Sequence, residues 1–261
     1  MKKACVLVFA GLDPSGGAGI QADIQAISDA GAHPLPIITA LTVQDNQHVH
    51  AVHPVATSIL VEQVNALIAH GTAIDAIKIG IVGSLANAQA IADAITTLRK
   101  LHPTLPVVLD PVLASGHGDV LTKGDAVQAL APLRTLATII VPNLPEARAL
   151  CDGDDQLDLQ AQRLLQDSPS VMIKGGHGEG DEIINTWFHE EQQRQWHWPR
   201  LLGDYHGSGC TLASAIAARL AQGISMEAAL EVAQNYTQHS LAHAYAIAPG
   251  QQIPHRLKEL S

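Results

Sequence analysis

Short apolar runs alternate with longer amphipathic segments along this chain. Apolar runs without a polar residue at every second position are typical of strands buried on both faces of a sheet. We therefore predict strands at Cys5–Ala10, Pro36–Leu41, Ile74–Ile79, Pro106–Leu109, Thr138–Val141 and Val171–Lys174. Between them, apolar residues at helical spacing predict helices at about Ala18–Ala30, Val55–Ala69, Ala86–Lys100, Ala126–Leu133 and Leu157–Gln166. Buried strands separated by helices predict a parallel sheet covered on both faces.

After the last of these strands the pattern changes. Two segments with alternating side chains predict an antiparallel hairpin at Glu182–Phe188 and Gln193–Trp198. Two closing helices are expected at Cys210–Gln222 and Met226–Tyr245. The sequence has no linker, repeat or low-complexity segment, so we interpret residues 1–261 as a single domain. The expected fold is a three-layer α/β/α sandwich with a mostly parallel, doubly wound sheet, whose ligand would lie beyond the carboxyl ends of the strands.

Composition favours a globular, cytoplasmic protein. The chain has 261 residues, 47% of them hydrophobic, which is enough to bury a core without disulfides. Its three cysteines, Cys5, Cys151 and Cys210, are far apart and odd in number, as expected in a reducing compartment. The formal net charge of −10 argues against nucleic acid or an anionic membrane as a partner. No apolar stretch approaches the ~20 residues of a membrane helix, and the opening MKKACVLVFAG is interpreted as a buried strand rather than a leader.

The most informative motif is HGSGCTLASAIAARLAQG at 206–223, where a glycine-rich turn leads into a helix. Free backbone N–H groups and the helix dipole favour anions at such a helix start. We therefore predict an anion hole at Gly207, Ser208 and Gly209. Cys210 would lie on the first helical turn, where the pKa of a thiol is expected to fall. The alternative is an ordinary turn with a small buried cysteine.

Acidic residues follow two of the predicted strands. Asp110 ends VVLDPV, and VPNLPEA places Asn143 three residues before Glu146. If Asn143 caps a helix, Glu146 lies on its first turn and faces the same crevice as Asp110. Each residue alone also fits a turn or a capping box. Together, at successive strand ends, they predict a site for Mg²⁺ and phosphate.

Lys174 stands at the end of a predicted strand, before two glycines in VMIKGGHGEGDE. A lysine in this position can bind a nucleotide phosphate, and glycines allow a ligand to approach the backbone closely. A plain turn before the hairpin explains the pattern equally well. The motif G-x-x-x-x-G-K-[ST] does not occur, which excludes a P-loop nucleoside triphosphatase.

A second glycine-rich loop, GLDPSGGAGIQAD, follows the first predicted strand. Gly17, Gly19 and Ala22 match the dinucleotide fingerprint, but the turn is too long and no ribose-binding acid follows the second strand. A small-ligand pocket is the better interpretation. Gln44 follows the next strand, and its amide can both donate to and accept from a heteroaromatic edge that bears an amino group. A solvated loop residue is the alternative for Gln44.

Two further signals are discounted. His48, His50 and His53 are crowded, but they are assigned to a loop without a cysteine or a spaced carboxylate, so a zinc site is not favoured. Trp196 and Trp198 alternate as in a strand, which favours packing of the hairpin over a platform for stacking bases.

Taken together, these segments resemble the hydroxymethylpyrimidine/phosphomethylpyrimidine kinases of thiamine synthesis, in the ribokinase-like superfamily. The resemblance extends over nearly the whole chain and depends on seven segments in order. These are GLDPSGGAGIQAD, ITALTVQDN, KIGIVGS, VVLDPV, PNLPEA, IKGGHGEGDE and HGSGCTLASAIAA.

The resemblance implies a kinase that uses ATP and Mg²⁺ to phosphorylate a pyrimidine alcohol and then its monophosphate. It also implies a homodimer. The residues that it places in the site are Gln44, Gly11, Asp23, Ile81 and Val108 for the pyrimidine; Lys174 and Gly175 for ATP; Asp110 and Glu146 for the metal; and Gly207, Ser208, Gly209 and Cys210 for catalysis. Cys210 would be the base, where most of the superfamily has an aspartate.

Three positions depart from the family pattern. Ile81 stands where a methionine is expected against the substrate ring, LASGHGD at 113–119 lacks a basic or hydroxyl residue before Ser-Gly, and Asp204-Tyr205 replaces Asn-Thr. The rival functions are a pyridoxal or pyridoxamine kinase on the same fold and a non-catalytic module that senses pyrimidines. A cysteine hydrolase is disfavoured because His206 breaks the G-x-S-x-G motif.

Overall fold

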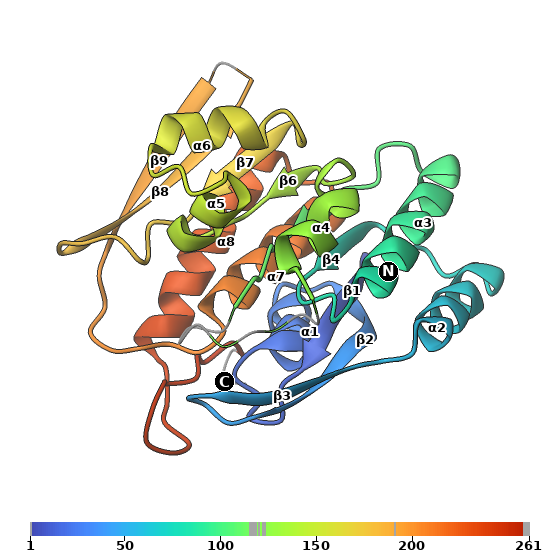
Figure 1. The fold of residues 1–261 in the computed structure, drawn as a ribbon, viewed down its shortest axis with the longest axis horizontal. Coiled ribbons are helices and arrows are strands. Elements are labelled where there is room, and N and C mark those ends of the chain that lie inside the picture. The colour runs from blue at the N-terminus through green and yellow to red at the C-terminus, as the bar shows by residue number, and fades with distance from the viewer. Residues whose placement is uncertain (1, 115–118, 120, 122–123, 191, 258–261) are drawn as a thin grey trace.

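A mixed sheet of nine strands runs through the protein (Figure 1). The computed structural model describes residues 2–114, 119, 121, 124–190 and 192–257. The strand order is β3-β2-β1-β4-β5-β6-β7-β8-β9. The strands are β1 (Cys5–Leu12), β2 (His33–Gln44), β3 (Val49–Pro54), β4 (Ala76–Ile79), β5 (Val107–Leu109), β6 (Ile139–Ile140), β7 (Ser170–Ile173), β8 (Glu182–His189) and β9 (Gln192–Pro199).

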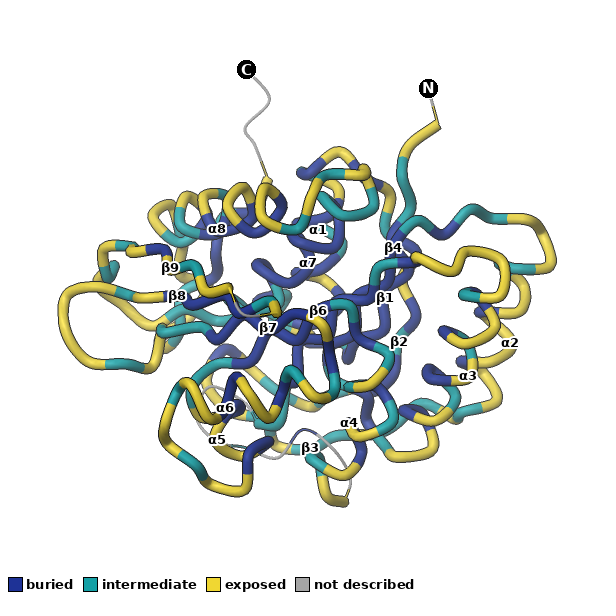
Figure 2. The backbone as a smooth tube through the Cα atoms, turned by 90° about the horizontal axis from the view of Figure 1, so that it is seen from above, coloured by how far each residue is buried: buried dark blue, intermediate teal, exposed yellow. Residues whose placement is uncertain are grey.

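Helices cover both faces of the sheet, and Figure 2 shows the three layers. One face is covered by α1 (Gly19–Asp29), α7 (Ser208–Ala221) and α8 (Met226–Ala242). The other face is covered by α2 (Thr57–Ala69), α3 (Leu85–Leu101), α4 (Ala126–Arg134), α5 (Leu144–Leu150) and α6 (Leu157–Leu164). The predicted three-layer α/β/α sandwich is confirmed.

The position of β1 in the middle of the sheet explains why its apolar residues do not alternate with polar ones. Leu7 and Phe9 pack into the hydrophobic cluster under α2, α3 and α4, whereas Val6 and Val8 pack into the cluster under α1, α7 and α8. All four side chains are at most 1% exposed. A strand buried on both faces has no solvent side, so both sets of positions are apolar.

The strands from β2 through β1, β4, β5 and β6 to β7 pair in parallel. Their carboxyl ends therefore meet at one edge of the sheet, as predicted. The register aligns Phe9 with Ile79, Ile79 with Leu109 and Leu109 with Ile140, which brings the loops that follow these residues together. Strands β8 and β9 form the predicted antiparallel hairpin. Trp196 is buried in the cluster under α8 and Trp198 packs against it, so the packing role is confirmed.

Strand β3 corrects the sequence-based assignment of this region to a loop. It pairs antiparallel with β2 at the sheet edge and contains His50 and His53. Their side chains are exposed and alternate with half-buried Val49, Ala51 and Val52. An edge strand with one solvated face lacks a continuous apolar run, which is why the pattern was missed. Within the described part of the chain, no helix is long and apolar enough to span a membrane.

Candidate active site

A cavity of about 1030 Å³ lies at the carboxyl edge of the parallel strands. It brings together loops from both halves of the sheet, because the strand order places the ends of β1 and β4 beside that of β5. Of the predicted site residues, those that line it are Gly11, Gln44, Ile81, Asp110, Glu146, Lys174, Gly207, Ser208, Gly209 and Cys210. Asp23, Val108 and Gly175 do not line it.

The glycine-rich turn before α7 is shaped by close packing. Gly207 caps the helix in the left-handed conformation, with φ 81°, and a Cβ there would collide with the carbonyl oxygen of Gly17. A Cβ on Gly209 would lie 3.1 Å from Lys174 Nζ and 3.8 Å from both carboxylate oxygens of Asp110. Glycine is thus required at 207 by the backbone, whereas at 209 a larger side chain would project into the space in front of Lys174 and Asp110. The start of α7 therefore faces the charged part of the cavity.

Three charged side chains converge there from successive strand ends. Lys174 Nζ lies 2.9 Å from Asp110 Oδ1 and 3.9 Å from Glu146 Oε2. Asp110 is 1% exposed and Glu146 is 7% exposed. Asn143 and Glu146 also form a capping box on α5, with the Asn143 N–H donating to Glu146 Oε2 over 2.7 Å. Glu146 therefore combines the two functions that the sequence left as alternatives, a helix cap and a position in the crevice.

Burial shifts the pKa values of this group. Desolvation, together with the nearby Asp110 charge, raises the pKa of Glu146 to about 7, against the lowering influence of Lys174. For Lys174, burial lowers the pKa, but Asp110 and Glu146 outweigh it and the net shift is upward. The ammonium group of Lys174 is therefore firmly protonated, and it compensates the carboxylates that surround it.

The thiol of Cys210 differs from the sequence-based expectation. Its pKa was expected to be below that of a free thiol, but burial raises it to about 11. Lys78 lowers the pKa, while the negative charges of Asp23 and Asp110 add to the increase. Desolvation thus outweighs the helix N-terminus and the buried ammonium group, so the thiol keeps its proton at neutral pH.

Asp23 was predicted to contact the substrate, but in the structure it lies behind the cavity lining. Its carboxylate is completely buried, accepts a hydrogen bond from Ser214 over 2.7 Å and lies 2.9 Å from Lys78 Nζ. Burial lowers the pKa of Lys78, but Asp23 outweighs it and the net shift is upward. Lys78 itself lines the cavity. Asp23 therefore supports a residue of the cavity floor.

Val108 and Gly175, which were also predicted to lie in the site, are likewise outside the cavity lining. Val108 is completely buried in the cluster under α1, α7 and α8, because it lies on β5 in the middle of the sheet. The N–H of Gly175 donates to Asn185 Oδ1 over 3.0 Å, and a Cβ there would collide with the carbonyl oxygen of Ile184. Gly175 is thus required by close packing against β8, and Gly176 lines the cavity in its place.

The opposite end of the cavity is lined mainly by uncharged groups, with the Asp13 carboxylate beside them. Gly11 follows β1, and a Cβ there would lie 3.6 Å from Ile81 Cδ1. Gln44 ends β2, half-buried in the lining, which disfavours the alternative of a solvated loop residue. Thr42 fixes the ends of β1 and β2 relative to each other by donating to the carbonyl oxygen of Leu12 over 2.7 Å. Gly11, Ile81 and Gln44 thus give this part of the cavity a largely apolar lining with one side-chain amide.

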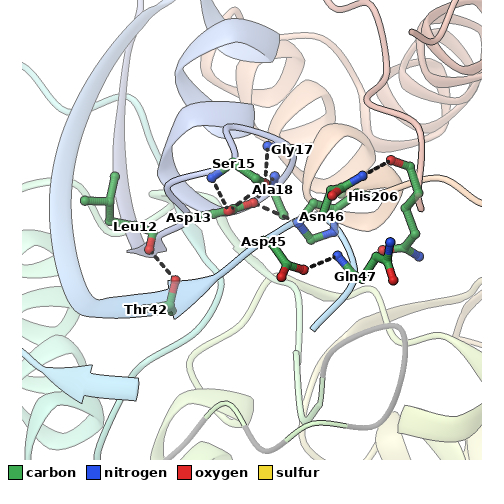
Figure 3. A network of polar contacts seen from close by, with 12 residues as sticks. Leu12, Asp13, Ser15, Gly17, Ala18, Thr42, Asp45, Asn46, Gln47 and His206 are labelled. Atoms are coloured by element: carbon green, nitrogen blue, oxygen red, sulfur yellow. Dashed lines mark hydrogen bonds and ion pairs between the residues drawn. The ribbon is translucent and has the colours of Figure 1, made fainter. Parts of the chain in front are cut away.

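Sequence reasoning missed a network that joins the two glycine-rich loops (Figure 3). Asp13, 3% exposed, accepts hydrogen bonds from the Ser15 side chain and the Ala18 N–H, and its Oδ2 lies 2.8 Å from His206 Nε2. Burial raises the pKa of Asp13, but the hydrogen bonds of His206 and Ser15 outweigh it and lower the pKa to about 2. The D-P-S-G sequence, typical of a turn, was the available signal.

Other candidates from the sequence stay outside this site. His50, on β3, has its Nε2 atom 3.3 Å from Oδ2 of Asp45, which lies in the exposed turn between β2 and β3. Among the described residues, no group of three or more His, Cys, Asp or Glu side chains could hold a metal. The departure from the family pattern at 113–119 falls largely outside the described residues.

Comparison with known proteins gives consistent results. A family model described as phosphomethylpyrimidine kinase matches residues 13–255. A hydroxymethylpyrimidine/phosphomethylpyrimidine kinase of Mycobacterium tuberculosis is 36% identical over 254 residues, which cover 94% of this chain and 90% of that protein. The chain spans only 34% of the length of a thiamine biosynthesis multifunctional protein of Corynebacterium efficiens, to which it is 34% identical.

Two solved structures have the same fold. A phosphomethylpyrimidine kinase of Clostridium difficile superposes with a TM-score of 0.76 and 32% identity, covering 90% of this chain and 98% of that one. A pyridoxal kinase of Bacillus subtilis, solved as an ADP complex, superposes with a TM-score of 0.85 and 26% identity, covering 98% of each chain.

Proposed function

The chain belongs to the phosphomethylpyrimidine kinase family, and on that premise we propose that it uses ATP to phosphorylate 4-amino-5-hydroxymethyl-2-methylpyrimidine and then the monophosphate, in thiamine biosynthesis. The observation that supports this most strongly is the single cavity in which the start of α7 faces the Asp110–Lys174 ion pair. A helix start beside a partly buried cation suits an anionic phosphoryl group. Gln44 and Ile81 at the other end suit a flat ring with an amino group.

Phosphoryl transfer passes through a loose transition state, so positioning and charge stabilisation provide most of the catalysis. In our proposal, the backbone N–H groups of Ser208, Gly209 and Cys210 bind the transferring phosphoryl oxygens. Lys174, whose ammonium lies close to Gly209, neutralises charge on the nucleotide phosphates. Gln44 orients the pyrimidine so that its hydroxymethyl group points toward the start of α7.

The donor set around Lys174 fits Mg²⁺. Asp110 and Glu146 offer two buried carboxylates, and the ammonium of Lys174, 2.9 and 3.9 Å from them, supports the proposal that a cation can bind beside both. Mg²⁺ prefers one or two carboxylates together with phosphate oxygens and water, so a set of two is sufficient. We propose that Asp110 and Glu146 hold the ion. When bound, it would neutralise charge that develops on the phosphates of ATP.

Cys210 is proposed as the base for the first transfer only. The alcohol must lose its proton, and the thiol lies on the first turn of α7, in the cavity lining. Because the pKa of Cys210 is about 11 in the free protein, ionisation of this thiol has to be coupled to ligand binding. The second nucleophile is a phosphate monoester whose second pKa is about 6, so it is already largely dianionic and needs no base.

A pyridoxal kinase is the second candidate, because the Bacillus subtilis enzyme with that name superposes over 98% of this chain. Parallel assays of ATP consumption with the pyrimidine alcohol, its monophosphate and pyridoxal would distinguish the two. We expect the highest kcat/KM for the two pyrimidines. A higher kcat/KM for pyridoxal would contradict the assignment, and tight pyrimidine binding without ATP consumption would indicate a sensing module.

We further propose that the protein acts in the cytoplasm as a homodimer, without nucleic acid or membrane as partner. Its three cysteines are free thiols, which suits a reducing compartment. The edge of the sheet at β2 and β3 exposes Leu41 and Val43, 46% and 50% exposed, where a second copy could pack. Sedimentation of the protein at micromolar concentration should give twice the chain mass, and a monomer would contradict the proposal.

A further inference from the structure

Arg256 is the largest side chain that the protein buries almost completely, at 2% exposed. It lies on the C-terminal segment, which returns after α8 toward the cavity. Asn46 donates from its side chain to the carbonyl oxygens of Pro249 and Gln251, over 3.2 and 3.1 Å, which fixes this segment beside the end of β2. The His206 N–H then donates to the carbonyl oxygen of Gln252 over 2.9 Å. The segment thus spans from the pyrimidine end of the cavity to the turn before α7.

The guanidinium of Arg256 binds acceptors from two parts of the chain that are far from it in sequence, residues 17–25 and 206–211. Nε donates to Thr211 Oγ1 over 2.7 Å, and Nη2 donates to the carbonyl oxygens of Gly17 and, over 3.4 Å, His206. Nη1 donates to Gln25 Oε1 over 3.2 Å. All of these acceptors are uncharged. Burial lowers the pKa of Arg256, but a guanidinium remains charged at neutral pH.

These bonds fix the orientation of the peptide groups at the turn. In a trans peptide the carbonyl oxygen and the following N–H point in opposite directions. When Arg256 holds the carbonyl of His206, the N–H of Gly207 must point away from the guanidinium. Thr211, which accepts from Arg256, donates in turn to the carbonyl oxygen of Gly207 over 2.8 Å, so the N–H of Ser208 is constrained in the same way. Gly207 and Ser208 both line the cavity.

The charge of Arg256 points to the same function. A buried charge is costly unless an opposite charge or strong hydrogen bonds compensate it. Neutral oxygens solvate this guanidinium, but none of its hydrogen-bond acceptors in the described chain removes its net positive charge. Its Nη2 would lie 2.9 Å from a Cβ on Gly207, directly behind the turn. The guanidinium therefore adds positive potential at the turn, beside the carboxylates of Asp13 and Asp23, and this potential favours an anion in front of the turn.

We propose that Arg256 is a positioning residue of the anion hole, which holds the 206–208 peptides with their N–H groups toward the phosphoryl group and adds positive potential from behind. The inference rests on the proposed phosphoryl-binding function of this turn. It assigns a role to the C-terminal segment, which makes no other contribution to the proposed chemistry.

The test compares Arg256→Met, Arg256→Lys and the control Arg219→Met. Arg219 lies in the last turn of the same helix and donates to Gln222, so its replacement removes the same charge without affecting the turn. We expect kcat to fall roughly tenfold to hundredfold for both transfers in Arg256→Met, because loss of one oxyanion donor costs ~10²- to 10³-fold and Arg256 acts indirectly. The KM for the pyrimidine alcohol should stay within about twofold. Arg256→Lys keeps the positive charge but loses the planar set of guanidinium donors, so its kcat should lie between those of the wild type and Arg256→Met.

A second measurement separates positioning from simple structural support. Inorganic phosphate, titrated by isothermal calorimetry without ATP or pyrimidine, should bind Arg256→Met about tenfold more weakly than Arg219→Met. If Arg256→Met does not fold, Arg256→Lys gives the same comparison, with a smaller loss. Equal phosphate affinities in the folded variants would overturn the proposal, even if the melting temperature falls.

The two proposals can fail separately. A wild-type protein that binds phosphate through Arg256 but phosphorylates neither pyrimidine would overturn the proposed substrate alone. An active wild type with a fully active Arg256→Met variant would overturn the role of Arg256 alone.

Discussion

The two ends of the cavity use different chemistry, although both lie at the carboxyl edge of one sheet. At the ends of β5 and β7, the buried Asp110 and the partly buried Lys174 lie 2.9 Å apart, and the start of α7 faces them. At the ends of β1 and β2, the lining is formed mainly by uncharged groups such as Gly11 and Gln44, and the Asp13 carboxylate there is held 2.8 Å from His206 Nε2. The charged end suits the phosphoryl group that both proposed reactions share. The neutral end suits the ring, which distinguishes one substrate from another.

This comparison indicates which variants should impair both transfers and which only one. Changes at the charged end should reduce both reactions, because both use the same phosphoryl site. Changes at the neutral end should alter substrate affinity and leave the transfer step nearly unchanged. Cys210, which lies on the first turn of α7 in the cavity lining, should affect the first transfer alone.

The largest effect is expected for Gly209→Val. Its side chain would project toward Lys174 Nζ, which already lies 3.1 Å from an added Cβ. We expect kcat to fall by at least about a thousandfold in both transfers, because several oxyanion contacts would be lost together. Gly209→Ala, whose single methyl meets the movable end of a lysine, is the graded control and should lose much less. Full activity in Gly209→Val would mean that the anion hole lies elsewhere.

Cys210→Ser should give the next largest effect, on one transfer only. Loss of a general base costs ~10²- to 10⁴-fold, so phosphorylation of the alcohol should fall in that range. Phosphorylation of the monophosphate should stay within roughly tenfold, since a dianionic nucleophile needs no base. Single-turnover rates of the two steps, measured separately, provide the test. Equal losses would make Cys210 a positioning residue.

Gln44→Leu should act at the neutral end. Loss of one or two hydrogen bonds to the ring, each worth ~1 kcal/mol, should raise the KM for both pyrimidines by roughly tenfold. The KM for ATP should change by less than about twofold, because the nucleotide lies at the charged end. Steady-state kinetics with each substrate varied in turn would test this. An equal increase in the KM for ATP would remove the distinction between the two ends.

The smallest effect on catalysis is expected from Asp13, which should act mainly on stability. Because the pKa of Asp13 is lowered to about 2 in the folded protein, its carboxylate stabilises the fold above its unfolded pKa of 3.8, and this contribution is lost as pH falls toward 2. Asp13→Asn should therefore lower the free energy of unfolding by about 2 kcal/mol at pH 5. The difference from wild type should shrink below pH 3.8. Urea titrations would measure it, with Glu62→Gln on the exposed side of α2 as control. A pH-independent difference would contradict the assigned pKa.

Much of the fold could be predicted because the central strands are buried on both faces, which leaves a continuous apolar run in the sequence. Strand β3 could not, since its exposed histidines interrupt the pattern at the sheet edge. The strand-end positions of Asp110 and Lys174 were also accessible, because residues that follow parallel strands must meet at one edge.

The sequence was a poor guide to side chains whose neighbours in the fold belong to segments far away in the chain. The partners of Asp23 are Lys78 and Ser214, 55 and 191 residues away in the chain, so its burial could not be inferred locally. The pKa of Cys210 was expected to fall because only its helix start was visible, whereas desolvation decides it. Arg256 gave no signal at all, because its hydrogen-bond partners come from segments far away in the sequence.

One measurement tests the central claim most directly. The wild-type protein, incubated with excess MgATP and the pyrimidine alcohol, can be followed by phosphorus NMR over a time course. We predict that a monophosphate ester appears first and then declines as a diphosphate ester forms, both from the same protein and both abolished by Gly209→Val. Absence of any phosphorylated pyrimidine, with pyridoxal phosphorylated under the same conditions, would contradict the account.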